Sequence, residues 1–258
     1  MIILGSGNMA TNLALAFHKA GVRLDAIYSH TPEHAKDLAG QVGVECFTDS
    51  LADINALLHE NAENQVILYC LKDSVLPEVL VQIDAPEALH LHTAGSMGVE
   101  VFEGKNKPHA GVLYPFQTLS KQRVLDFAEL PVFVEAVNPN DLPKIEDLAK
   151  QISHKVYPAD SETRRRLHVA GVFANNFTNC MYAIAAEVLR PTGLPEDVLL
   201  SLIDETAAKV HTMPARQAQT GPAKRYDENV MNKHLELLGD PELQEIYRLI
   251  SKNIHEHA

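Results

Sequence analysis

The stretch Ile2-Ile3-Leu4-Gly5-Ser6-Gly7-Asn8-Met9-Ala10 decides the fold of this chain. Three apolar residues that favour a buried strand run into a Gly-x-Gly-x-x-Ala turn, and an amphipathic helical pattern follows. In such a turn the first glycine permits a tight bend, the second lets a pyrophosphate approach the backbone, and the small third residue lets the helix pack closely. The sequence therefore predicts a dinucleotide site in which helix amides starting near Asn8 hold the pyrophosphate. A glycine turn without a ligand is the alternative.

Short β-rich runs alternate with helical patterns up to about residue 157. The predicted strands span residues 1–4, 24–28, 44–47, 66–71, 89–92, 112–114 and 132–134, and the helices between the early ones span 12–20, 33–39 and 51–59. Strands that alternate with helices of about ten residues are typical of βαβ units with right-handed crossovers. We therefore expect an α/β protein with a doubly wound, mainly parallel Rossmann sheet.

The pattern changes after Tyr157-Pro158. Helical periodicity without further strands follows, over residues 161–190, 196–211, 227–238 and 241–256. This switch in period predicts a domain boundary. We expect a Rossmann dinucleotide-binding domain over residues 1–158 and an all-α domain, which serves substrate binding and dimerisation, over residues 159–258.

Composition and charge narrow the possible partners. The 258 residues carry a formal net charge of −12, which disfavours nucleic acid and anionic membranes as partners. A bound phosphate must then be held by a local feature such as a helix N-terminus.

The three cysteines, Cys46, Cys70 and Cys180, have no metal-type spacing. Without a secretory signal or a long apolar run, the expected location is the cytoplasm.

Histidines offer one weak metal hypothesis. His90-Leu91-His92 places two imidazoles on one face of a predicted strand, but no third ligand is evident. We therefore expect no metal site.

The end of the second strand indicates which nicotinamide cofactor is bound. Folds that prefer NAD(H) usually carry an acidic residue there to bind the ribose hydroxyls. Here the chain reads Ser29-His30-Thr31, and two hydroxyls with an imidazole suit a 2′-phosphate better. We expect NADP(H) rather than NAD(H). The alternative is that Ser29 and Thr31 only cap the next helix.

Later strand ends should complete the crevice, because ligands of such sheets bind beyond the carboxyl ends of the strands. The predicted cofactor contacts are Gly5, Ser6, Gly7, Asn8, Met9, Ala10, Ser29, His30, Thr31, Cys70, Leu71, Lys72, Thr93 and Ala94. The predicted substrate contacts from these strand ends are Gly95, Ser96, Tyr114 and Gln117. Ordinary turns at these places are the alternative.

One face of the predicted helix 161–190 is polar. At spacings of three and four it carries Arg164, His168, Gly171, Asn175, Thr178, Asn179 and Tyr182. Such a row needs partners, because buried polar groups are costly when left unpaired. One interpretation is that the row lines the cleft between the domains, with His168 as proton donor, Asn175 polarising the substrate and Asn179 contacting it. The other is a hydrogen-bonded network at a subunit interface.

The segment Gln219–Asp227 joins two predicted helices and carries glycine, proline and two cations. Functional residues concentrate on such loops, and Arg225 could clamp a carboxylate or phosphate, with Thr220 beside it. A plain helix connector is the alternative. The apolar surface of helices 161–190 and 196–211 predicts a homodimer through the helical domain.

Several of these motifs together resemble a bacterial family that joins a Rossmann-like domain to a helical domain of unknown function. The most specific are L-H-x-A-x-V-F-A-N-N-F-T-N at 167–179 and T-G-P-A-x-R-x-D at 220–227. The resemblance implies short-subunit oxidoreductases that use NADP or a deazaflavin. More distantly, the chain is similar to pyrroline-5-carboxylate reductases and 6-phosphogluconate dehydrogenase-like proteins, which implies a helical domain of the latter type.

Two departures from the distant relatives limit what their chemistry implies. In pyrroline-5-carboxylate reductases, loops at the positions of 114–118 and 220–227 meet substrate, often across a dimer. The paired glycines and threonines of the second loop are replaced here by Ala223-Lys224-Arg225-Tyr226, which argues against proline biosynthesis. The 3-hydroxyacid dehydrogenases carry a lysine four residues before an asparagine on the long helix, and this chain has none.

The leading hypothesis is an NADP(H)-dependent oxidoreductase that transfers hydride to or from a small anionic metabolite in the interdomain cleft. The cofactor supplies the chemistry, and the protein supplies placement and electrostatics. The first alternative is a non-catalytic NADP(H)-binding sensor or partner-binding protein. The second is hydride exchange between NADP and a deazaflavin.

Overall fold

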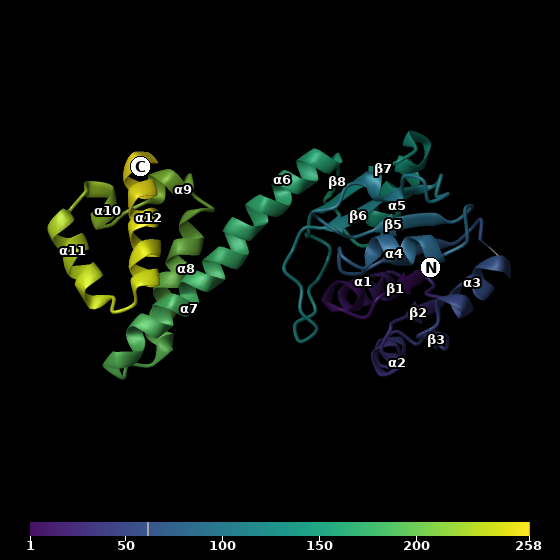
Figure 1. Ribbon diagram of the computed structural model, residues 1–258, viewed down its shortest axis with the longest axis horizontal. Coiled ribbons are helices and arrows are strands. Elements are labelled where there is room, and N and C mark those ends of the chain that lie inside the picture. The colour runs from purple at the N-terminus through teal and green to yellow at the C-terminus, as the bar shows by residue number, and fades with distance from the viewer. Residues whose placement is uncertain (61, 258) are drawn as a thin grey trace. The chain divides into compact units, whose positions relative to one another are not determined.

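The computed structural model describes residues 1–60 and 62–257. Eight strands form one sheet in the order β3-β2-β1-β4-β5-β6-β7-β8 (Figure 1). They are β1 (Ile2–Leu4), β2 (Ala26–Tyr28), β3 (Phe47–Thr48), β4 (Val66–Tyr69), β5 (Leu89–His92), β6 (Ala110–Pro115), β7 (Val132–Ala136) and β8 (Val156–Pro158). Strands β1 to β6 are parallel, β7 is antiparallel to β6, and β8 is parallel to β7. The predicted mainly parallel Rossmann sheet is confirmed.

Helices connect and cover these strands. They are α1 (Asn8–Lys19), α2 (Pro32–Gln41), α3 (Leu51–Glu60), α4 (Leu76–Gln82) and α5 (Leu142–Lys150), with short 3₁₀ turns η1 (Val99–Phe102) and η2 (Pro139–Asp141). The sequence pattern did not predict α4, α5 or β8. Helix α4 is only seven residues long, too short to show clear periodicity, and β8 is a three-residue edge strand that ends in proline.

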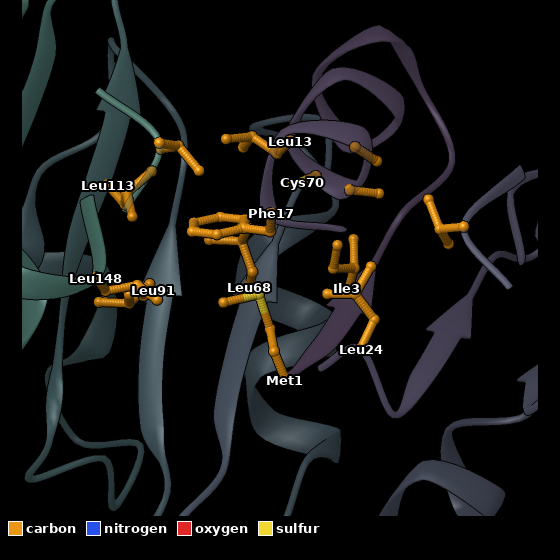
Figure 2. Close-up of a cluster of buried hydrophobic side chains, with 14 of the residues drawn as sticks. Met1, Ile3, Leu13, Phe17, Leu24, Leu68, Cys70, Leu91, Leu113 and Leu148 are labelled. Carbon is orange, nitrogen blue, oxygen red and sulfur yellow. The ribbon is translucent and has the colours of Figure 1, made fainter. Parts of the chain in front are cut away.

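Strand β1 shows how the core is divided by the sheet. Its side chains alternate, so Ile3 packs with residues of α1, α2 and α5, whereas Ile2 and Leu4 pack with residues of α3 and α4. Figure 2 shows the first of these clusters, where Phe17 and Leu13 of α1 lie over the apolar side chains of the central strands. Burial on both faces explains why the strands read as continuous apolar runs.

The long helical segment that starts after β8 is interrupted. It consists of α6 (Ser161–Gly171), a π-helical stretch η3 (Val172–Phe177) and α7 (Thr178–Leu189). The chain divides into two compact units within it, Met1–Phe177 and Thr178–Ala258. By its contacts α6 therefore belongs with the sheet. The predicted boundary at residue 158 marks where the strands end, and its meaning as a domain boundary stays a prediction.

The second unit is helical. After α7 come η4 (Arg190–Thr192), η5 (Glu196–Leu199), α8 (Leu200–Lys209), α9 (Ala215–Ala218), α10 (Pro222–Arg225), α11 (Glu228–Leu237) and α12 (Pro241–His257). Among residues 178–257, Ala223 alone is buried within the chain. No helix in the described part of the chain is long and apolar enough to cross a membrane.

Candidate functional site

The loop between β1 and α1 has the geometry of a phosphate cradle. Gly5 has φ +127°, and a Cβ there would lie 2.3 Å from the carbonyl oxygen of Cys70, so only glycine fits. A Cβ at Gly7 would meet no atom within 4 Å, which leaves open space at the start of α1. No side chain caps that helix end. The free amides and the open space fit the pyrophosphate of a dinucleotide.

Ser6 and Ser29 tie this loop to the end of β2. The Ser6 hydroxyl donates to the Ser29 hydroxyl oxygen at 2.8 Å, and the Thr31 amide donates to the same oxygen at 3.3 Å. Both serines are buried, whereas His30 is exposed and Thr31 is half-buried. Thr31 occupies the N-cap of α2, but its side chain makes no capping bond. The stretch therefore offers the His30 imidazole and the Thr31 hydroxyl to a ligand.

The ends of β4, β5 and β6 meet at one edge of the sheet, as predicted for parallel strands. Cys70, Leu71 and Lys72 follow β4, and Lys72 is exposed there. After β5 the Thr93 hydroxyl donates to the carbonyl of Tyr69, and the Ser96 hydroxyl donates to Asp73. These bonds join the two strand ends into a continuous rim beside the glycine loop.

His168 of α6 also reaches this rim, as does Arg165, which donates to the Ser96 carbonyl at 3.3 Å. The Nδ1 of His168 lies 3.1 Å from the hydroxyl of Tyr114, and the two rings are tilted by 60°. Gly95 packs against this contact, because a Cβ there would lie 2.7 Å from both His168 Nδ1 and the Tyr114 hydroxyl. Three residues predicted separately for substrate and proton transfer thus meet at one point.

A pocket of about 470 Å³ opens beside His168. Its wall is formed by Tyr114, Phe116, Gln117, Thr118, His168, Gly171, Val172, Ala174, Asn175 and Asn176. Gly171 is needed because Phe116 packs against it, so that a Cβ would lie 2.8 Å from the ring. The wall combines aromatic surface with carboxamide and hydroxyl groups, and none of these lining residues is acidic, lysine or arginine.

A buried ion pair fixes α6 to the sheet. Arg164 is fully buried and pairs with Glu135 of β7, and it also donates to the carbonyl of Met97 at 2.6 Å. The Ser161 hydroxyl donates to Glu135 as well, at 2.8 Å. Arg164 therefore does not line the pocket with the other polar residues of its helix, but holds His168 in register with the rim.

The sequence pattern did not predict two further features of the site. The π-helical stretch Val172–Phe177 carries Asn175 and Asn176, and such stretches occur frequently at functional sites. Asn12 of α1 donates to the carbonyl of Ser120 at 3.0 Å and so ties the loop after β6 to the helix of the glycine loop. Neither leaves a local sequence signal, because each depends on contacts between distant segments.

The histidines of β5 have structural partners. His90 Nδ1 lies 2.8 Å from the Tyr69 hydroxyl, and its Nε2 lies 2.8 Å from the Ala85 carbonyl. His92 Nδ1 accepts from the Ala94 amide at 3.2 Å. Burial lowers the pKa of His90 to about 4 and that of His92 to about 3, so both rings are neutral. Within the described residues no cluster of three or more metal-ligating side chains occurs.

The remaining predicted substrate contacts belong to the second unit. Asn179 lies on α7, Thr220 precedes α10, and Arg225 ends α10; all three side chains are exposed within the chain. Gly221, with φ +102°, makes the turn into α10. Asp227 caps α11 by accepting from the Val230 amide at 3.3 Å, as its position predicted. Substrate binding by Asn179, Thr220 and Arg225 stays a prediction.

Two family models match the chain. Residues 1–92 match the family described as NADP oxidoreductase, coenzyme F420-dependent, and residues 130–254 match a domain of unknown function, DUF2520. Comparison with the curated proteins gives no match.

Solved structures give closer information. A protein of Bacteroides fragilis, described as a candidate NADP oxidoreductase, is 48% identical, with a TM-score of 0.90 over 99% of this chain and 97% of its own. A reductive aminase from Aspergillus terreus in complex with NADPH is 14% identical, with a TM-score of 0.72 over 100% and 95%.

A pyrroline carboxylate reductase from Plasmodium falciparum, with NADP bound, is 12% identical, with a TM-score of 0.59 over 98% and 97% of the two chains. At such identities the last two show only a shared fold. The Bacteroides fragilis protein is similar enough over its whole length to decide the family. This chain belongs to the family of NADP oxidoreductases that join an F420-dependent-type Rossmann domain to a DUF2520 domain.

Proposed function

We propose that this protein is an NADP(H)-dependent oxidoreductase that transfers hydride to or from a small metabolite bound in the pocket beside His168. The observation that carries the proposal is the meeting of His168, Tyr114 and Gly95 at the strand ends next to the cradle of Gly5 and Gly7. The family and the NADP(H)-bound proteins of the same fold support the cofactor.

The residues of this chain bind the cofactor and orient it. The amides at the start of α1 and the open space at Gly7 would hold the pyrophosphate. His30 and Thr31 would receive the 2′-phosphate, and buried Ser29 would support them by accepting from the Thr31 amide. Thr93 and Ala94, which follow β5, would border the nicotinamide. When bound, NADP(H) supplies or accepts the hydride.

The pocket residues handle the substrate. His168 holds the proton that the reaction exchanges, and the Asn175 carboxamide polarises the reacting group. Tyr114 and Gln117 form part of the pocket wall, and Gly95 packs against the contact between Tyr114 and His168. Ser96, which follows Gly95 in the same loop, is proposed as a further substrate contact. The pocket wall contains no arginine or lysine. Arg225, Thr220 and Asn179 of the second unit are the residues that we propose to bind an anionic group of the substrate.

Calorimetric titration with NADPH, NADH and a deazaflavin tests the cofactor. We expect tight binding of NADPH and weak binding of NADH. The matched variant His30→Asp should reverse part of this preference, because a carboxylate repels the 2′-phosphate and accepts from a ribose hydroxyl. Equal affinities for NADPH and NADH in the wild type would refute the role of residues 29–31. Unchanged NADPH concentration with every small carbonyl or imine acid tried would refute the proposed reaction.

A second candidate is hydride exchange between NADP and a deazaflavin. The match of residues 1–92 to an F420-dependent family favours it. The polar wall of Gln117, Asn175 and Asn176 fits a small hydrogen-bonding substrate better than a broad ring system. The deazaflavin titration distinguishes this candidate from the reduction of a small metabolite, because binding of the deazaflavin in the presence of NADP would support hydride exchange.

We also propose a homodimer formed through the helical unit. Its large apolar side chains are exposed within one chain: Leu202 by 64%, Leu237 by 83% and Leu249 by 62%. A unit with so few buried side chains needs a further apolar surface to be stable, and a second copy supplies a self-complementary one. Sedimentation at micromolar concentration should give a dimer, and a monomer would refute the proposal.

A further inference from the structure

Three histidines of this protein meet a tyrosine hydroxyl through Nδ1. The pairs are His90 with Tyr69 at 2.8 Å, His234 with Tyr247 at 2.8 Å, and His168 with Tyr114 at 3.1 Å. A tyrosine hydroxyl can donate or accept, and a neutral imidazole carries its proton on one nitrogen only. The direction of each bond therefore decides which ring nitrogen can donate to something else.

The His90 pair has its direction fixed by a third group. His90 Nε2 lies 2.8 Å from the carbonyl oxygen of Ala85, and a carbonyl can only accept, so Nε2 carries the proton. Burial keeps the ring neutral, which leaves Nδ1 as an acceptor. Tyr69 must then donate to Nδ1. This pair serves as an internal reference for the arrangement in the pocket.

We propose that Tyr114 donates to Nδ1 of His168 in the same way, and thereby holds the proton of the neutral imidazole at Nε2, the nitrogen that is left to meet the substrate. The inference rests on the proposed function and deepens it. Tyr114 is a positioning residue in this arrangement. Its ring is buried at the end of β6. Gly95 packs closely against both Tyr114 and His168, so that a Cβ there would lie 2.7 Å from each of the two hydrogen-bonding atoms.

Two further observations support this direction. Burial raises the pKa of the Tyr114 hydroxyl, so it keeps its proton and remains able to donate. His168 Nε2 makes no hydrogen bond with the part of the chain that the structure describes, whereas Nδ1 does. Because His168 lines the pocket and the Tyr114 hydroxyl occupies Nδ1, Nε2 is the ring nitrogen left for a ligand.

An Nε2–H donor selects the class of substrate that can be reduced. The reacting bond must be C=O or C=N, whose oxygen or nitrogen accepts from Nε2. In the reductive direction the carbon receives the hydride and the π electrons move to the heteroatom, which takes the Nε2 proton. Nδ1 takes the phenolic proton of Tyr114 in the same step, so the imidazole stays neutral. Nδ1 then returns this proton to the Tyr114 phenolate and Nε2 takes a proton from solvent, which restores the starting tautomer.

Nitrogen-15 NMR of the full-length protein, labelled at histidine, tests the inference without a substrate. His168→Asn identifies the His168 signals by their loss. We expect a pyridine-type Nδ1 and a pyrrole-type Nε2 at neutral pH, as in His90. Tyr114→Phe should shift the His168 signals towards a mixture of the two tautomers. Tyr247→Phe is the matched control, and it should change His234 alone.

A protonated Nδ1 in wild-type His168 would overturn the inference, and so would unchanged His168 signals in Tyr114→Phe. The wild-type spectrum alone is decisive if that variant does not fold. NADPH is titrated into the same samples. Absence of binding together with the expected tautomer would refute the proposed function and leave the Tyr114–His168 arrangement intact, so the two failures are distinguishable.

Discussion

Replacing Gly7 by alanine should separate cofactor binding from folding. Gly7 has φ −75°, which any residue adopts, and its Cβ would meet no protein atom within 4 Å. We therefore expect the free energy of unfolding to change by less than about 1 kcal/mol. The new methyl group occupies the space through which a pyrophosphate approaches the amides of α1.

The loss of affinity follows from the hydrogen bonds at that helix end. Moving the phosphate away forfeits at least one hydrogen bond to a charged group, a loss of about 1.5–3 kcal/mol, which is roughly a 10- to 150-fold rise in Kd. Calorimetric titration with NADPH measures the Kd, and urea unfolding measures stability. The contrasting variant is Gly5→Ala, whose Cβ lies 2.3 Å from the Cys70 carbonyl at φ +127° and should destabilise the fold itself. Wild-type NADPH affinity in folded Gly7→Ala would refute the assignment of the cradle.

Three other perturbations test the Arg164–Glu135 ion pair, the buried ring of His92 and the proposed dimer. Arg164→Met should lower the free energy of unfolding by about 3–5 kcal/mol, because Glu135, whose side chain is 14% exposed, loses its charged partner and keeps only Ser161 as a donor. The double variant with Glu135→Met should recover part of this loss in urea unfolding. The folded chain holds His92 at a pKa of about 3 against an ordinary 6.5, so the unfolded chain binds more protons between these values and stability falls as the pH drops below 6.5. His92→Asn, whose side-chain oxygen can still accept from the Ala94 amide, should reduce that slope by about 1.4 kcal/mol per pH unit, and an unchanged slope would contradict the burial of a neutral ring. Leu202→Glu should give a monomer in sedimentation, whereas the control variant Ser201→Glu should remain a dimer. If both variants remain dimeric, α8 is not part of the interface.

Local patterns were sufficient wherever the structure depends on neighbouring residues. The turn Gly5–Ala10 was readable because its spacing alone fixes a strand, a tight bend and a helix start. The helices α11 and α12 begin and end within a residue or two of the predicted 227–238 and 241–256, since caps and periodicity are local. The family prediction, which rested on such motifs, is confirmed.

Sequence alone therefore determined the Rossmann sheet, the glycine cradle and the helical second half. Only the tertiary structure decided that Arg164 pairs with Glu135 and that Tyr114 contacts His168. Tyr114 and His168 lie 54 residues apart in the chain, so no local pattern joins them. The tertiary structure also decided that the polar helix changes to π-helical geometry at Val172–Phe177. The physical reason is that periodicity specifies which face of an element is buried, whereas the partner of a buried polar group is chosen by how separate elements pack.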